Sequence, residues 1–420
     1  MFKKILLFVA MIFLLFLQLQ IPLVDFLNLS EIFQWIDEIF SVTFFIIFLL
    51  IVVYTLRLRK KIFSVFLIII LFSIICLFSG IFVNENRLVV SILGTFDYTK
   101  NFLGILAFGM LNFTERQIKG IYNILSSFTL FICVVAIVLV IKYFTLENNL
   151  LLVLLGSIKE IRYGIPRVAP FNIHPNMFGL LSLLFFILDF AILPKINFRK
   201  LLLLLGIIFS VSRMVWMGFV VGILFLIFQF KIRSKIVYIF LIIAFFIILI
   251  LPKVLKITQI EYISEGYYRG YVFKKSLEIF KDSPLLGIGP GMYGGVISVK
   301  FNSPIYEKYN FSKYWYNFGL AKFHSLDMFW PQILVECGII GTLLFIYFLF
   351  FLYKITKRHY KYLDIYFIKR FCLGLLVVPI VIFFYLFGSG LNLASFLTTY
   401  SVFLGMCLGV RNSYENSAYK

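Results

Sequence analysis

The chain has 420 residues, of which 62% are hydrophobic and only 14% are charged, and its formal net charge is +20. Soluble globular domains carry about 25% charged residues, so this composition excludes a soluble protein. The basic residues stand in short clusters between apolar runs, a pattern that argues against nucleic-acid binding and is typical of membrane proteins. Apolar runs of about 20 residues cross a bilayer as helices, and their order predicts an all-α polytopic membrane bundle of about twelve transmembrane helices.

The first apolar run follows Lys3 and Lys4. No small-residue cleavage site comes after it, so we expect a retained helix rather than a signal peptide. The basic cluster at 57–61 marks a cytoplasmic loop, because short cytoplasmic loops are rich in lysine and arginine. The first crossings are predicted at about 5–21, 41–56, 62–83 and 88–111.

The fourth predicted crossing carries two ionisable residues, Asp97 and Lys100. They are three positions apart and therefore share one face of a helix. Ionisable residues at membrane depth usually face the interior of a bundle or a cavity. An ion pair without a functional role is the alternative, and the spacing fits both.

An external loop is predicted between the fifth and sixth crossings, which lie at about 121–143 and 176–193. It contains Arg162, Arg167 and His174. His174 lies between two prolines and is expected to cap the sixth helix.

Residues 201–230 form a nearly uninterrupted apolar run with Ser210, Ser212 and Arg213 at its centre. A single helix would be roughly 45 Å long, well beyond a hydrocarbon core of about 30 Å, and it would bury Arg213 at the bilayer centre. Both flanks are basic and are expected on the cytoplasmic side. We therefore predict two short crossings with Arg213 at the external turn between them, although no glycine or proline marks that turn.

The only long polar interval follows a ninth predicted crossing at about 236–252, and a tenth crossing begins near Asp327. His359 lies in the next basic run, where we expect it to be solvated. The last two crossings are predicted at about 371–387 and 391–410. The chain is thus divided into an N-terminal bundle, a long external loop between the ninth and tenth helices, and C-terminal helices with a short tail, at 1–252, 253–325 and 326–420.

The predicted external face collects Arg162, Arg167, Arg213, Arg269 and His324. Arginine stays charged and bonds phosphate oxygens in pairs, so Arg167, Arg213 and Arg269 are candidates for binding a lipid-linked phosphate or pyrophosphate. Contact with lipid headgroups is the alternative for each arginine. Neutral imidazole can accept a proton from a hydroxyl near pH 7, so His324 is the candidate general base, with a structural histidine as the alternative.

Glu336 lies about three helical turns after His324 and is interpreted as a buried structural acid or an orienting partner. Residues 289–294 have the glycine spacing of a dinucleotide-binding loop, but no strand–helix unit surrounds them, so we reject a cofactor there. A tight turn, or backbone N–H groups facing phosphate, are the remaining interpretations. The 5 cysteines lack disulfide or zinc spacing and are expected to be buried, and no acidic cluster suggests a metal.

Three stretches in order resemble the O-antigen ligase and O-antigen polymerase family of bacterial integral membrane glycosyltransferases. They are Ser210-Val-Ser212-Arg213, then Arg269 ahead of Pro284-Leu-Leu-Gly287-Ile-Gly289-Pro290-Gly291, then His324-Ser325 with Glu336-Cys-Gly338-Ile-Ile-Gly341. The interval from His324 to Gly338 is longer than the family's usual spacing. The resemblance implies that Arg213 and Arg269 hold a pyrophosphate, and that His324 is the general base.

The resemblance implies transfer of a glycan from an undecaprenyl-pyrophosphate carrier to an acceptor sugar at the periplasmic face of the bacterial inner membrane, without nucleotide sugar, cofactor or metal. A ligase would attach a finished polymer to lipid A–core, and this is the assignment we favour. A polymerase would extend a lipid-linked chain, with a chain-length regulator as a possible partner. A flippase or other transporter of lipid-linked oligosaccharides is the alternative from another class. Both termini are expected in the cytoplasm.

Overall fold

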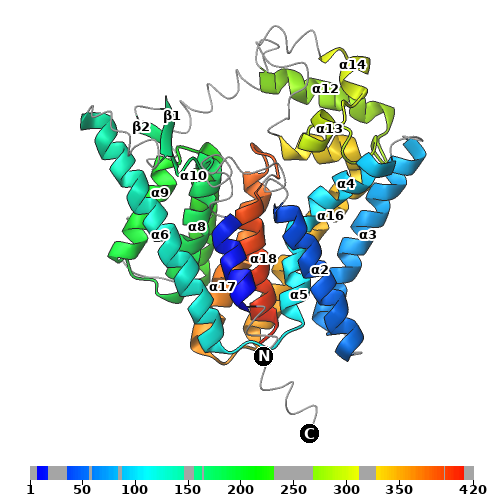
Figure 1. Ribbon diagram of the computed structural model, residues 1–420. Coiled ribbons are helices and arrows are strands. Elements are labelled where there is room, and N and C mark those ends of the chain that lie inside the picture. Colours follow the sequence, from blue (N-terminus) through cyan, green and yellow to red (C-terminus); the bar gives the residue numbers. More distant parts are fainter. Residues whose placement is uncertain are drawn as a thin grey trace.

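The computed structural model describes residues 7–17, 36–55, 59–83, 88–145, 156–162, 165–230, 268–311, 328–391 and 393–410. Figure 1 shows a bundle of helices with two smaller structures at one end. One is the hairpin of β1 (Gly156–Arg162) and β2 (Ile165–Pro170), and the other contains α12 (Tyr268–Asp282), α13 (Val296–Lys300) and α14 (Ile305–Lys308). We call residues 268–311 the cap.

Among the described residues, six helices are long and apolar enough to cross a membrane. They are α2 (Ile36–Thr55), α3 (Lys60–Val83), α6 (Glu115–Thr145), α8 (Pro175–Ile192), α16 (Phe329–Lys361) and α17 (Tyr366–Tyr385). Shorter apolar helices are Leu7–Leu17, α10 (Arg213–Phe230) and α18 (Ala394–Leu408), and α9 (Phe198–Phe209) precedes α10. The helical membrane class is thus confirmed. The ninth predicted crossing and much of the predicted long loop lie outside the described residues, so the count of about twelve stays a prediction.

The bundle end opposite the cap gathers basic residues from distant parts of the chain. Arg59 donates hydrogen bonds to the carbonyl oxygens of Gly109 (3.2 Å) and Gly409 (3.0 Å). The Nζ atom of Lys61 lies 3.1 Å from Nδ1 of His359. The start of α3 therefore lies at the same end of the bundle as the ends of α5, α16 and α18.

The expectation that His359 is solvated was wrong. Its ring is buried, and Nε2 lies 2.8 Å from the carbonyl oxygen of Cys407 near the end of α18. Its basic neighbours in the sequence suggested that the ring is exposed to solvent. In the structure the end of α18, which lies 48 residues later in the chain, covers the ring.

The fourth predicted crossing is broken. It consists of α4 (Leu88–Thr99), the short helix η2 (Lys100–Phe102) and α5 (Leu103–Gly109). At the break, Nζ of Lys100 lies within 2.6–3.0 Å of carboxylate oxygens of Asp97, Asp37 and Glu38. The ion pair expected within one helix is therefore part of a larger cluster that ties α2 to the break.

Residues 201–230 form two helices, α9 and α10, with a turn at Ser210–Ser212, as predicted. No glycine marks the turn because Val211 itself adopts a positive φ of 43°. This conformation is costly for a β-branched residue and persists only where the surroundings enforce it. Here Trp216 Nε1 bonds the carbonyl oxygen of Ile207 (3.0 Å), and Gly179 of α8 packs closely against Ser210.

Two apolar cores support this architecture. The larger core runs between the bundle helices, and the smaller one joins the cap to α4 and α16. We call the smaller one the cap core, and it contains Val90, Tyr271, Val272, Ile279, Ile288, Met292, Tyr293, Ile305, Tyr306, Phe311, Met328 and Val335. The cysteines are all buried and free, as expected.

Candidate functional site

The candidate residues that the structure describes gather at the bundle end that carries the hairpin and the cap. The α9–α10 turn, the start of α16 and the hairpin all lie there (Figure 1). Phe329 at the start of α16 donates a backbone hydrogen bond to Ser389, just after α17, at 3.2 Å. Segments that are far apart in sequence are therefore held together around this end.

The hairpin carries a cluster of charges in which Glu160 of β1 bridges two arginines. Its Oε1 atom accepts from Arg162 (2.7 Å) and from Arg167 of β2 (2.5 Å), and an irregularity between Ile158 and Glu160 shifts the strand register. Partial burial opposes ionisation of Glu160, but the hydrogen bonds from the two arginines hold its pKa below the ordinary value. Glu160 is therefore a carboxylate at neutral pH.

Arg167 joins three elements at this end of the bundle. Besides Glu160, its guanidinium bonds Oδ1 of Asn176 at the start of α8 (3.0 Å) and the carbonyl oxygen of Ser210 (3.4 Å). Its side chain is only 12% exposed. Arg167 therefore fixes the turn from which α10 and its first residue, Arg213, begin.

His174 has the capping role that the sequence predicted. Its Nδ1 atom accepts a hydrogen bond from the backbone N–H of Asn176 at 3.3 Å, and Pro175 occupies the first turn of α8. This cap holds Asn176 where it contacts Arg167.

Residues 284–294, which we call the glycine segment, dock onto a break in α16. Gly338 interrupts α16 with φ 62°, and Gly287 faces it with φ 76°. A Cβ at Gly338 would lie 2.3 Å from the carbonyl oxygen of Leu285, and one at Gly287 would lie 2.5 Å from the carbonyl oxygen of Glu336. Only glycine allows the two backbones to approach so closely.

Hydrogen bonds complete this junction between backbones. Ile288 and Gly289 donate to the carbonyl oxygens of Val335 and Glu336, and Ile339 donates to that of Pro284, each at 2.9 Å. The glycine segment thus satisfies backbone groups that the helix break leaves without helical partners. The tight-turn interpretation is confirmed, and the N–H groups of Ile288 and Gly289 bond the protein itself.

Glu336 lies at the centre of the junction and is completely buried. Its Oε2 atom accepts from the hydroxyl of Tyr98 (2.5 Å), and Oε1 accepts from the backbone N–H of Tyr293 (2.7 Å). The backbone of Gly291 and the side chain of Gln332 also hydrogen-bond to this carboxyl group. Glu336 is a buried structural acid, one of the two roles that the sequence suggested, and it bonds the glycine segment.

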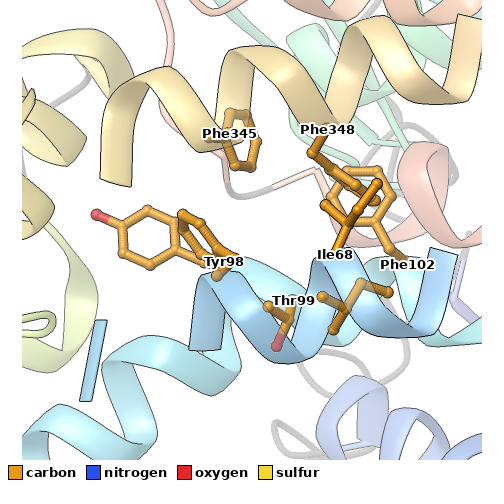
Figure 2. A pocket seen from close by; sticks show the side chains of 8 residues that line it. Ile68, Tyr98, Thr99, Phe102, Phe345 and Phe348 are labelled. Carbon is orange, nitrogen blue, oxygen red and sulfur yellow. The ribbon is translucent and has the colours of Figure 1, made fainter. Parts of the chain in front are cut away.

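A small apolar cleft with a cavity volume of about 10 Å³ lies beside Tyr98 between α3, α4 and α16. Figure 2 shows Phe102, Phe345 and Phe348 around it, whereas the Tyr98 hydroxyl points away from these rings. None of the lining residues is charged, so the cleft is not built to hold a phosphate.

The structure brings together part of the predicted site. Arg167 lies beside the turn that carries Arg213, and the backbone of Arg269 lies in the first turn of α12. The side chain of Arg269 and all of His324 lie outside the described residues. Sequence reasoning missed Tyr98 and Glu160. Tyr98 follows Asp97 directly and is a polar side chain within an apolar run, which was the only available signal. No local pattern in the sequence indicated that its hydroxyl bonds Glu336.

Residues 200–346 match the family model described as O-antigen ligase. No curated protein matches the chain. The matched stretch contains the α9–α10 turn, the cap and the break in α16. The resemblance to the O-antigen ligase and polymerase family is therefore confirmed for this part of the chain.

Proposed function

We propose that this chain is a membrane glycosyltransferase of the O-antigen ligase type. It moves a glycan from an undecaprenyl-pyrophosphate carrier to an acceptor sugar of lipid A–core at the periplasmic face of the bacterial inner membrane. One observation carries the proposal. Residues 200–346 match the O-antigen ligase family, and within them the Arg213 turn and the glycine segment docked on α16 lie at the same end of the bundle.

In the proposed reaction the acceptor hydroxyl oxygen attacks the anomeric carbon of the donor sugar. The bond from this carbon to the pyrophosphate oxygen breaks, His324 takes the hydroxyl proton as general base, and undecaprenyl pyrophosphate leaves. Arg213 and Arg269 bind the pyrophosphate and offset its charge as it departs. In this scheme arginine supplies the positive charge, and neither a cofactor nor a metal is needed.

The described contacts of Arg167 favour a supporting role for this residue. Its guanidinium bonds Glu160, Asn176 and Ser210, so it fixes the Arg213 turn and adds positive charge beside it. Binding of a pyrophosphate oxygen by Arg167 would require it to release one of these partners. We therefore assign direct contact with the pyrophosphate to Arg213 and Arg269.

The distribution of basic clusters supports a periplasmic site. Arg59 and Lys61 lie at the end opposite the cap, where they contact the ends of α5, α16 and α18. Lys119 at the start of α6 lies over the ring of Phe367 in α17 at that end. Because short cytoplasmic loops are rich in lysine and arginine, the hairpin and cap end faces the periplasm in this proposal.

A polymerase of the same family is the second candidate, because the family resemblance covers both activities. It would use the same arginines and histidine but would transfer the growing glycan to a lipid-linked repeat unit. The difference lies in the acceptor, which would occupy space beside the segment that carries His324. A chain-length regulator would then be a partner.

The test is to profile surface polysaccharide in a deletion strain complemented with wild type or with His324→Ala. A ligase predicts that the deletion removes polymer from lipid A–core while long polymer accumulates on the lipid carrier. A polymerase predicts core capped by a single repeat unit. Full rescue by His324→Ala would remove this residue from the mechanism and favour a flippase or transporter.

Purified protein in lipid nanodiscs provides the direct assay. A lipid-linked glycan and lipid A–core are mixed with wild type, Arg213→Ala or Arg269→Ala, and glycan transfer is measured. We expect each arginine variant to lower kcat at least about 100-fold, as the removal of a group that stabilises developing charge does. Arg199→Ala, at the opposite end of the bundle, is the control for general loss of a partly buried, ion-paired arginine.

A further inference from the structure

We infer that Tyr98 is a positioning residue for the proposed transfer, because its hydrogen bond to Glu336 fixes the glycine segment on the break in α16. The inference rests on the proposed function. Tyr98 lies in α4, more than 100 residues before the stretch that matches the family. It belongs to no motif that the resemblance uses.

Tyr98 is held in one orientation by its surroundings. Its side chain is buried, and its ring makes edge contacts with Phe72 of α3 (centroids 6.0 Å apart) and Phe329 of α16 (5.9 Å). The hydroxyl is thereby directed at Oε2 of Glu336, 2.5 Å away.

Glu336 connects Tyr98 to the glycine segment, because its carboxyl group bonds both. The other carboxyl oxygen of Glu336 accepts from the backbone N–H of Tyr293 at 2.7 Å. The carbonyl oxygen of the same residue accepts from Gly289 (2.9 Å) and from Ser79 of α3 (3.2 Å). Glu336 therefore links α3, α4 and α16 to the glycine segment, and Tyr98 supplies the connection from α4.

A second contact between α4 and the glycine segment lies one helical turn earlier. A Cβ at Gly94 would lie 2.3 Å from the backbone nitrogen of Gly291 and 2.5 Å from the carbonyl carbon of Pro290. Gly94 and Tyr98 are four residues apart, so they share one face of α4. This face is shaped to receive the glycine segment, with close backbone contact at Gly94 and a polar contact at Tyr98.

The junction also positions the two residues that flank the segment containing His324. Phe311 and Met328 flank residues 312–327, and both pack in the cap core with Tyr293. Tyr293 bonds Glu336 and therefore depends on the orientation of that carboxyl group. A shift of the glycine segment would move both ends of the segment, and displacements of about 1 Å in a catalytic group can cost about 100-fold in rate.

The test compares Tyr98→Phe with Tyr400→Phe. Both variants remove one hydroxyl from a buried tyrosine, but the Tyr400 hydroxyl has no hydrogen-bond partner among the described residues. Two quantities are measured in nanodiscs. They are kcat and KM for transfer from a lipid-linked glycan, and backbone hydrogen exchange of peptides that cover 284–295.

We expect Tyr98→Phe to lower kcat about 10- to 100-fold with KM for the donor within about threefold, and to speed exchange at Ile288, Gly289 and Tyr293. Tyr400→Phe is expected to behave like wild type in both measurements. Adding Glu336→Gln to Tyr98→Phe should lower kcat by much less than the product of the two single effects, because both changes disrupt the same bond.

Wild-type kcat in Tyr98→Phe would overturn the inference, whatever the exchange shows. An equal loss of kcat in Tyr400→Phe would also overturn it, because the effect would then reflect removal of any buried hydroxyl. Failure of the proposed function is a separate result. Wild-type protein would then transfer no glycan, while the exchange measurement would still report whether Tyr98 holds the glycine segment.

Discussion

The Nε atom of Arg167 lies 3.4 Å from the carbonyl oxygen of Ser210, so a β-hairpin arginine supports the turn that precedes Arg213. This turn contains Val211 in a left-handed conformation, which a β-branched residue adopts only under constraint. The hairpin, the start of α8 and the α9–α10 turn therefore act as one unit. A substitution of Arg167 should therefore alter the position of Arg213, because the turn connects the two residues.

We predict that Arg167→Lys lowers transfer about tenfold although it keeps the charge. Lysine has one compact ammonium group and cannot bond Glu160, Asn176 and Ser210 in the planar arrangement of a guanidinium. The loss should appear in kcat more than in the amount of folded protein, which gel filtration of the purified variant measures.

Arg162→Lys is the matched control for Arg167. Arg162 bonds the same carboxylate, but its side chain is 38% exposed and lies farther along the hairpin. We expect activity within about twofold of wild type, because exposed ion pairs contribute little. Equal losses in both variants would show that charge, and not the support of the turn, explains the effect.

A second prediction concerns the pH dependence of the hairpin. The pKa of Glu160 is depressed in the folded protein, so its contribution to stability is present above the unfolded pKa of about 4.3 and is lost as pH falls through the folded value. Backbone hydrogen exchange in 156–170, corrected for intrinsic rates, should therefore accelerate below about pH 4.

Glu160→Gln tests the origin of this pH dependence. An amide does not ionise, so this variant should show faster exchange at neutral pH and a flatter profile between about pH 3 and pH 6. An unchanged pH profile in Glu160→Gln would assign the transition to another acid.

The sequence predicted features that depend on local pattern. The basic flanks of 201–230 and the length of its apolar run together indicated a turn at Arg213, and the structure has that turn. His174 before Pro175 likewise indicated a helix cap. These predictions succeeded because the charge of the flanks, the length of an apolar run and the residues at helix ends can all be recognised within about thirty residues of sequence.

Contacts between distant segments were beyond the reach of such patterns. At the break between α4 and α5, Lys100 contacts Asp37 and Glu38, which precede it by 62 residues or more. Tyr98 and Glu336 are 238 residues apart. Tertiary contacts of this kind override local helix propensity, which would have continued the fourth crossing without a break.

We predict that Lys100→Met destabilises the protein by about 3–5 kcal/mol, because it leaves buried carboxylates without their cation. The side chains of Lys100 and Asp37 are only 9% and 11% exposed, so water cannot replace the lost contact at low cost. Thermal unfolding in detergent should show a markedly lower Tm than wild type.

Lys119→Met provides the comparison for Lys100. Lys119 pairs with Glu115 at 2.6 Å one helical turn away, but its side chain is 47% exposed. Its loss is expected to cost less than about 1 kcal/mol. If Lys100→Met unfolds at the same temperature as Lys119→Met, the buried cluster does not stabilise the break between α4 and α5.

The close approach of two backbones at Gly338 gives the last prediction. Gly338→Ala should destabilise the junction by at least about 2 kcal/mol, because alanine at φ 62° is strained and its Cβ would lie 2.3 Å from the carbonyl oxygen of Leu285. The expected result is a lower Tm and faster exchange across 284–295. Gly120→Ala in α6 is the control, since a Cβ there meets nothing within 4 Å and should raise stability by about 0.5–1 kcal/mol. A Gly338→Ala protein with wild-type Tm and wild-type exchange would mean that the glycine segment does not depend on close backbone contact with α16.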